Sequence, residues 1–273
     1  MPFQEVKTDY TCTFKQCFME GLGTFALIYI GGWSIMMHEL QQIDLVGVAL
    51  AHTFVLAFMV WGGCNISGAH YNLAITLATL VTGHIGYLKA LYYSLFQFLG
   101  ALLAGCLLQI FKYFYPGDSK MFHTVLGYPH ADIDGFGIQI CFGVELMATF
   151  FLVFMVYSTL ISKTKPVSEV YGITIGGSLG MAILSIGPIT GAALNPWRVL
   201  GPACVSGELI RSEFWYAWIY YLGCPLGGVL AGIVWKLVFM WEDEVKGSTD
   251  IKEEDLPLNE SDAKNTEVDA KNT

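Results

Sequence analysis

The segment "TGAALNPWRVLGPA", residues 190–203, places an asparagine, a proline and an arginine between two long apolar stretches of the chain. Its arginine, Arg198, is the first in the sequence, and the next one is Arg211. An arginine at membrane depth is costly and is usually functional. The class of protein therefore depends on whether Arg198 lies within a membrane and on what surrounds it there.

The composition is that of a membrane protein. Of the 273 residues, 54% are hydrophobic and 14% are charged, and the mean hydropathy is +0.53. Long apolar stretches each approach the roughly 20 residues with which a helix spans the hydrocarbon core. We predict an all-α membrane protein with six transmembrane helices over residues 14–37, 44–62, 87–115, 137–162, 170–188 and 214–241.

Two further apolar stretches, residues 71–82 and 194–206, are too short to cross a membrane. They follow the segments "SGAHYN" and "TGAALN", in which glycine and alanine allow close approach of the backbone. The sequence therefore predicts two re-entrant half-helices in addition to the six spans.

The two halves of the chain match each other. Glu20 precedes Asn72 at nearly the spacing with which Glu145 precedes Asn195, and Thr-Phe follows each glutamate at the same distance. Three spans per half require the second half to enter the membrane from the opposite side. We therefore predict an inverted repeat with a binding or transport site near the midplane. A channel domain over residues 14–241 would consist of repeats at about 14–115 and 137–241.

The charges favour cytoplasmic termini. Lysines in short loops concentrate on one side of the predicted spans, at Lys7, Lys15, Lys163, Lys165, Lys246 and Lys252. Residues 1–13 would then form a cytoplasmic N-terminus. Much of the net charge of −9 lies in residues 242–273, which we predict to be an acidic, disordered cytoplasmic tail. No basic patch supports binding to nucleic acid.

The seven cysteines show no CxxC or Cys/His ligand spacing, and their number is odd. Most of them lie in apolar stretches, where a thiol behaves as a small hydrophobic side chain. We predict no disulfide framework, no metal site and no cofactor.

The chain up to about Trp241 resembles the aquaporins, the major intrinsic protein family. The resemblance rests on Glu20, "ISGAHYNLAITLA" (66–78), Glu145, "TGAALNPWRVLGPA" (190–203) and "YYLGCPLGGVLAG" (220–232). It implies a passive channel rather than an enzyme, with lipid, water and small neutral solutes as its partners. It also implies a homotetramer in the plasma membrane or in a vacuolar or vesicular membrane.

The pore chemistry follows from the two loops. We expect the backbone carbonyls of Gly68, Ala69, His70 and Gly191 to accept hydrogen bonds from a file of water molecules. Asn72 and Asn195 are favourable N-caps, and the half-helix ends that they begin carry a positive dipole end. The two amides would orient one water at the midplane, and the positive field would oppose protons and cations.

The resemblance also implies a selectivity filter. Arg198 matches the family's constriction arginine, and spacing from the two asparagines adds His52, Ile183 and Ala192. This combination resembles plant vacuolar-membrane aquaporins more than strict water channels. We therefore expect ammonia, urea and hydrogen peroxide to be candidates for passage beside water.

Glu20 and Glu145 match glutamates that, in the family, accept hydrogen bonds from the re-entrant loops. The half-helix motifs are Asn-Leu73-Ala74 and Asn-Pro196-Trp197, where the family has Asn-Pro-Ala twice. Leu73 adds an N–H that proline lacks. The indole of Trp197 adds volume where an alanine packs between the half-helices, so we expect it to affect the width of the pore.

Two other functions remain open from the sequence. One is a glycerol or urea facilitator, which Val199 and the pair Tyr220-Tyr221 disfavour by comparison with the family's glycerol channels. The other is a poorly conducting structural membrane protein, for which the departures at Leu73 and Trp197 leave room. Catalysis by Glu20 and Glu145 is disfavoured because the repeat places them on opposite sides of the pore.

Overall fold

The computed structural model describes residues 11–114, 129, 131–161, 170–207 and 212–240. Contacts divide the chain into two units, residues 1–236 and residues 237–273, and the described part of the second unit is 237–240. The predicted acidic tail, 242–273, lies outside the described residues.

The described residues fold into helices. The long ones are α1 (Phe14–Glu39), α2 (Leu45–Ser67), α4 (Tyr87–Phe114), α6 (Ile138–Val156), α7 (Tyr171–Thr190) and α9 (Trp218–Val234). The short ones are α3 (Leu73–Val81), α5 (Ile133–Phe136) and α8 (Pro196–Ser206). Further helical turns are a 3-10 segment (Ser212–Ala217) and two π-helical segments, Tyr157–Ile161 and Trp235–Phe239. Six helical segments are long and apolar enough to cross a membrane, which confirms the predicted fold class.

Local sequence signals account for the helix ends. The side chain of Thr13 accepts the N–H of Gln16, and the side chain of Gln16 accepts the N–H of Thr13, so a capping box begins α1. Asp44 caps α2 in the same sense. The prediction that this span ends at residue 62 was wrong, because the helix continues to Ser67. It ends at Gly68, whose φ of 91° suits glycine.

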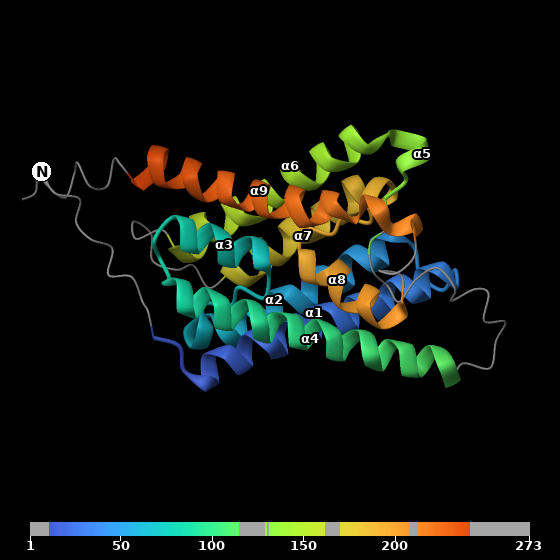
Figure 1. Cartoon of the computed structure of the whole chain (residues 1–273), viewed down its shortest axis with the longest axis horizontal. Helices are drawn as coiled ribbons and strands as arrows, with labels where there is room; N and C mark the ends of the chain where they lie inside the picture. Colours follow the sequence, from blue (N-terminus) through green and yellow to red (C-terminus); the bar gives the residue numbers. More distant parts are fainter. Residues whose placement is uncertain (1–10, 115–128, 130, 162–169, 208–211, 241–273) are drawn as a thin grey trace, which may run out of the picture. The chain divides into compact units, whose positions relative to one another are not determined.

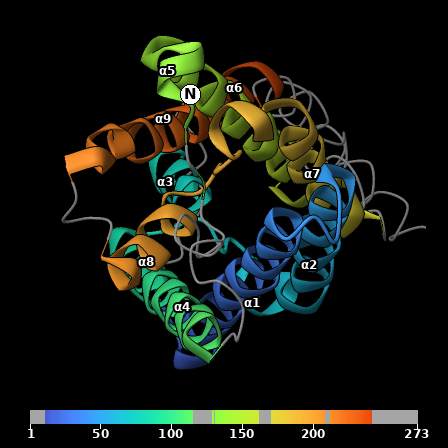
Figure 2. The same ribbon diagram turned by 90° about the vertical axis from the view of Figure 1, so that its right-hand side faces the viewer.

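The long helices of residues 1–236 form a ring in which neighbours follow the order α4, α1, α2, α7, α6 and α9 (Figure 2). The order reflects the repeat, because α1 packs against α4 as α6 packs against α9. In the same way α1 packs against α2 as α6 packs against α7. The contact between α2 and α7 joins the two halves, as expected for an inverted repeat.

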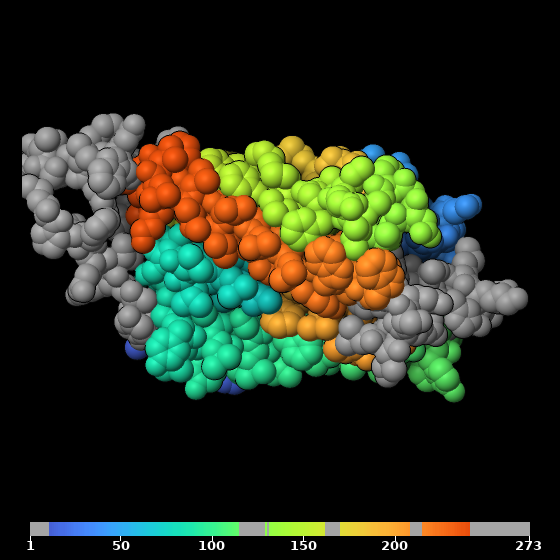
Figure 3. Space-filling model, turned by 45° about the horizontal axis from the view of Figure 1, so that its top comes forward, coloured from blue at the N-terminus to red at the C-terminus, as the bar shows by residue number. Residues whose placement is uncertain are grey.

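The half-helices α3 and α8 lie between α4 and α9 (Figure 1). Each packs against a long helix of the other repeat, α3 against α9 and α8 against α4. Figure 3 shows α3 and α4 beside α9 on one face. This packing of each half-helix against the other repeat brings the N-terminal ends of α3 and α8 together. Asn72 and Asn195 cap these two ends.

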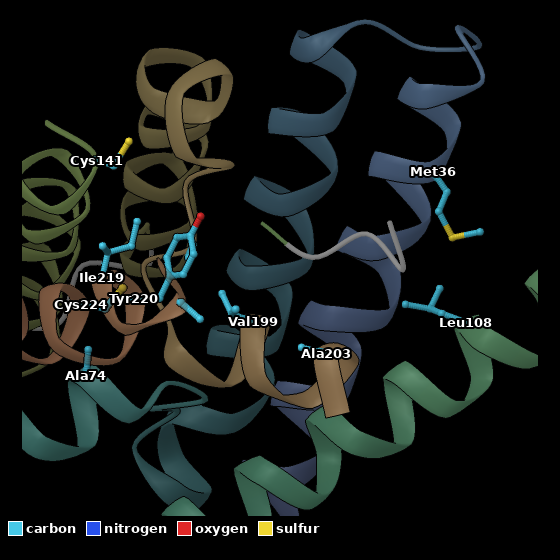
Figure 4. Packing of buried hydrophobic residues seen from close by; sticks show 11 residues of the cluster. Met36, Ala74, Leu108, Cys141, Val199, Ala203, Ile219, Tyr220 and Cys224 are labelled. Carbon is cyan, nitrogen blue, oxygen red and sulfur yellow. The ribbon is translucent and has the colours of Figure 1, made fainter. Parts of the chain in front are cut away.

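Small residues permit this packing. A Cβ added at Gly100 of α4 would collide with the carbonyl oxygen of Gly21 in α1, and one at Gly227 of α9 would collide with that of Leu146 in α6. The two glycines occupy matching places in the repeats. A buried cluster around Tyr220 joins α8, α9 and α3, and it consists largely of small side chains such as Ala74 (Figure 4).

One pair of cysteines is joined locally at the start of α1. The structure joins Cys12 and Cys17 by a disulfide, and the other five cysteines are free, so the chain has no disulfide framework. Cys12 lies directly before the cap residue of α1, and the first helical turn brings the two sulfurs together. This single link is local and does not cross-link different helices.

Candidate functional site

The carboxylate of Glu20 holds the first re-entrant loop. It is completely buried on α1 and accepts the backbone N–H groups of His70 at 3.0 Å and Tyr71 at 2.6 Å. It also accepts the hydroxyl of Ser67 at 2.5 Å and the side-chain amide of Gln97 at 2.8 Å. Four donors thus converge on two oxygens, which a carboxylate can accept because it offers about four lone-pair sites.

Glu145 does the same for the second loop. It is completely buried on α6 and accepts the N–H groups of Ala193 at 2.8 Å and Leu194 at 3.0 Å. The hydroxyl of Thr190 donates at 2.6 Å, and the thiol of Cys224 lies at 3.5 Å. The inverted repeat therefore extends from the helices to individual hydrogen bonds.

These bonds stabilise an unusual backbone. After Gly68, the non-glycine residues Ala69 and Tyr71 have φ of 54° and 52°. After Gly191, Ala192 and Leu194 have φ of 48° and 53°. Left-handed conformations at such residues cost on the order of 1 kcal/mol or more each. The buried carboxylates offset this cost by accepting the N–H groups that the loops turn toward them.

Asn72 and Asn195 connect the two loops to each other. The Nδ2 of Asn72 donates to the carbonyl of Leu194 at 2.8 Å, and the Nδ2 of Asn195 donates to the carbonyl of Tyr71 at 2.9 Å. Each Oδ1 accepts a backbone N–H of its own half-helix, that of Ala74 for Asn72. The asparagines therefore cap their own half-helices and bind the opposite loop at once.

The departure at Leu73 adds a bond to this centre. Its backbone N–H, which a proline would lack, donates to the Oδ1 of Asn195 at 3.4 Å. That same oxygen also accepts the N–H of Trp197 at 3.1 Å. Pro196 at the matching place of α8 has no N–H to offer Asn72, so this contact exists on one side only.

Two cavities follow each other at this centre. One, of about 430 Å³, is lined by residues that include Asn65, Gly68, His70 and Thr79. The other has about 10 Å³ of room for water, which is close to what one molecule needs. Its lining residues are Leu27, Leu56, His70, Asn72, Ile75, Leu152, Leu179, Ala193, Leu194, Asn195 and Arg198. His70 lines both cavities, so the two are neighbours.

Arg198 lies one turn into α8 and is almost fully buried. Its Nη1 donates to the carbonyl of Gly191 at 3.2 Å and to the carbonyl of Ala192. These contacts place the guanidinium beside the second loop, at the cavity that both asparagines line. The structure therefore brings together Arg198 and Ala192 of the four predicted filter residues.

The other two filter residues lie on the helix pair α2 and α7. His52 and Ile183 are buried, and neither lines either of the two cavities described above. The Nδ1–H of His52 donates to the carbonyl of Val48 at 2.9 Å, so the Nε2 of a neutral ring is an acceptor. Among the described residues this Nε2 has no hydrogen-bond partner, and it faces Gly31 of α1.

The expectation that Trp197 fills the contact between the half-helices was wrong. Its indole is directed toward α4, where it lies 5.1 Å from the ring of Phe98 and donates to Gln97 at 3.2 Å. It also packs against the buried cluster of Ile28, Ala101 and Ala104. The volume of the indole is therefore taken up between α1 and α4, away from the cavity.

Sequence reasoning missed the residues that support the loops from α4 and α9. The hydroxyl of Tyr93 donates to the carbonyl of Ser67, and that of Tyr220 donates to the carbonyl of Thr190, both at 2.7 Å. Gln97 follows Tyr93 by one helical turn. A comparison of the two repeats could have found the tyrosines, because both stand in the spans that follow the half-helices.

Two half-helices that meet at buried asparagines inside a ring of apolar helices define a multi-pass membrane protein built around a central path. The chain belongs to the major intrinsic protein family, whose sequence model matches residues 7–235. Among similar proteins, Aquaporin TIP2-3 of Arabidopsis thaliana is 36% identical over 214 residues, covering 78% of this chain and 80% of that protein. Aquaporin TIP4-4 of Zea mays is 38% identical over 199 residues, covering 72% and 73%.

A solved structure shares the fold. The aquaglyceroporin of Plasmodium falciparum superposes with a TM-score of 0.72 at 21% identity, covering 85% of this chain and 98% of that one. At this identity the likeness concerns the fold alone. Membership in the family agrees with the prediction of a channel rather than an enzyme.

Proposed function

We propose that this protein is a passive water channel. The observation that carries the proposal is the pair Asn72 and Asn195, which both line the small cavity. Each amide has two N–H donors and uses one of them on the opposite loop, so a second remains for a water molecule. The names of the similar TIP proteins, which are aquaporins, support the same function.

The same centre opposes protons and ions. The N-terminal ends of α3 and α8 meet here, and each carries the positive end of a helix dipole. Arg198 adds a full positive charge at the same cavity. A cation would meet three positive groups, and a water whose oxygen accepts from both amides would be unable to relay a proton along the file.

His52, Ile183, Ala192 and Arg198 form the selectivity filter in this proposal. The donors of Arg198 can replace hydration for a small polar solute, while Ile183 and Ala192 keep the ring partly apolar and His52 fills the side next to α1. Ammonia, urea and hydrogen peroxide are the neutral solutes that we expect to accompany water.

Gly31→Ala is predicted to change solute selectivity while leaving the fold intact. A Cβ at Gly31 would collide with the Nε2 of His52, which is the far end of a side chain and can move. The ring would be displaced, so the ratio of ammonia or urea permeability to water permeability should shift at least about twofold. Stopped-flow measurements on proteoliposomes give this ratio.

Gly62→Ala is the matched control. Gly62 lies on α2, where a Cβ would meet nothing within 4 Å, so its permeability ratios should equal those of the wild type. If Gly31→Ala also leaves every ratio unchanged, His52 is not part of the filter.

The glycerol facilitator is the weaker alternative. The similar TIP proteins are named aquaporins, which favours water. Val199 and Tyr220 are completely buried in one hydrophobic cluster and do not line the cavity, so they give no direct argument about glycerol. The non-conducting alternative also loses support, because neither Leu73 nor Trp197 is among the residues that line the two cavities.

The proposal also covers the membrane in which the channel lies, its orientation and its oligomeric state. We place the channel in a vacuolar membrane, because the similar proteins are named TIP aquaporins and the predicted filter resembles theirs. The loop lysines favour cytoplasmic termini. A homotetramer with one pore per subunit is expected from the family resemblance.

The test is an osmotic jump on proteoliposomes that contain the folded full-length chain. Fast shrinkage with a low activation energy, together with slow entry of glycerol, supports the water channel. Fast entry of glycerol or urea without water flux favours a facilitator. Water flux equal to that of empty liposomes, with no solute entry, refutes both channel functions.

A further inference from the structure

A side chain of the half-helix α8 contacts one of the residues that hold the first re-entrant loop in place. Trp197 follows Pro196 on α8, which belongs to the second repeat. Its Nε1–H donates to the Oε1 of Gln97 on α4. Gln97 is completely buried, and its Nε2 donates to Glu20 at 2.8 Å and to the Oγ1 of Thr76 at 3.0 Å.

From Gln97 two routes lead to the pore. Through Glu20 the link reaches the N–H groups of His70 and Tyr71 in the first loop. Through Thr76 it reaches the start of α3, because the hydroxyl of Thr76 donates to the backbone carbonyl of Asn72 at 3.1 Å. One hydrogen bond from the indole thus connects to both sides of the pore asparagine of the first repeat.

The indole and the carboxylate of Glu20 hold the amide of Gln97 from its two ends in one orientation. An indole nitrogen can only donate, so Trp197 requires the oxygen of Gln97 on its side. The NH₂ group must then face Glu20 and Thr76, which both accept. Without the indole the carboxylate of Glu20 would still favour this orientation, but the buried oxygen of Gln97 would lose its donor, so the side chain would be held from one end only.

The corresponding hydrogen-bonded link to Glu145 is absent among the described residues. The residue that follows Asn72 by two positions, as Trp197 follows Asn195, is Ala74. Cys224 is the partner of Glu145 there, one helical turn after the tyrosine that supports the second loop. Ala74 therefore occupies the position that matches Trp197, and Cys224 occupies the position that matches Gln97.

We propose that Trp197 is a positioning residue, which holds Gln97 and through it the first re-entrant loop, so that it sets the permeability of a pore it does not line. The inference rests on the proposed water channel. If the free energy of this one hydrogen bond holds the first re-entrant loop in its conducting position, loss of the bond lowers the water permeability roughly twofold to tenfold.

The experiment compares Trp197→Phe, Gln97→Leu and the double variant in proteoliposomes, with flux counted per folded channel. Trp197→Phe keeps an aromatic ring beside Phe98 and removes the donor. We expect both single variants to lower water permeability, with a double variant no worse than the poorer single one. Trp218→Phe, in which a partly exposed tryptophan is changed on α9, is the matched control and should conduct as the wild type does.

Two results would overturn the inference. The inference requires Trp197→Phe to conduct less water than the control, so equal flux contradicts it. Effects of the single variants that simply add in the double variant show that Trp197 does not act through Gln97.

A second readout separates this inference from the proposed function. The indole 15N–1H signal of Trp197, assigned by its loss in Trp197→Phe, should shift in Gln97→Leu because the acceptor is gone. If the wild type conducts no water, the water channel is refuted, and this signal alone then tests the link. An unchanged signal overturns it.

Discussion

Glu145→Gln is expected to lower the thermal midpoint of the protein by roughly 10 °C and to abolish most of the water flux. The carboxylate accepts two backbone N–H groups of the second loop, the hydroxyl of Thr190 and the thiol of Cys224. A glutamine has one acceptor oxygen, and its NH₂ group would face donors. At least two buried donors would lose their partner, at about 1–3 kcal/mol each.

The loss should affect the loop first. Ala192 and Leu194 adopt left-handed conformations, which the bonds to Glu145 help to stabilise. Without those bonds the loop can relax, and Leu194 would no longer offer its carbonyl to Asn72. Thermal unfolding in detergent and the osmotic jump on liposomes measure the two effects separately.

Glu39→Gln provides the control, because Glu39 is exposed at the end of α1 and its change should leave both properties as they are. Glu20→Gln should behave like Glu145→Gln, since Glu20 also accepts four donors. A Glu145→Gln variant with the midpoint and flux of the wild type would show that the loop does not depend on this carboxylate.

Arg198→Ala is expected to raise proton and cation leakage by roughly one to three orders of magnitude while water still passes. The guanidinium is almost fully buried at the cavity that both asparagines line. A unit charge within several ångström of the path opposes a cation by about 2–4 kcal/mol at an effective dielectric constant near 20. Its removal also widens the path, so urea entry should rise.

Two variants separate the charge from other contributions. Arg198→Lys keeps a positive charge but loses the planar fork that binds the carbonyls of Gly191 and Ala192. It should exclude cations better than Arg198→Ala does. Lys15→Ala removes an exposed charge near the start of α1 and should not change leakage. Proton-sensitive dyes in liposomes with an imposed gradient report the result.

Leakage of Arg198→Ala at the level of the wild type would contradict the role of the arginine. The barrier would then have to come from the N-terminal ends of α3 and α8 and from the two asparagines. Asn195→Ala, measured in the same liposomes, would test that remaining source because Asn195 caps α8 and binds the carbonyl of Tyr71.

The spans and half-helices could be predicted from the sequence because their signals are local. Length and apolar composition determine whether a segment can cross a membrane, and capping residues such as Thr13, Asp44, Asn72 and Asn195 mark where helices begin. The paired motifs and the two glutamates determined the inverted repeat and the candidate site, since their order and spacing repeat along the chain.

Only the tertiary structure decided where the side chains point and what they bind across the fold. Trp197 was expected at the contact between the half-helices, and it lies against α4 because Gln97 and Phe98 offer it a partner and space there. The N–H of Leu73 found an acceptor in the other repeat, at Asn195. Such contacts join residues that are far apart in the chain, so they depend on how whole helices pack and no local pattern contains them.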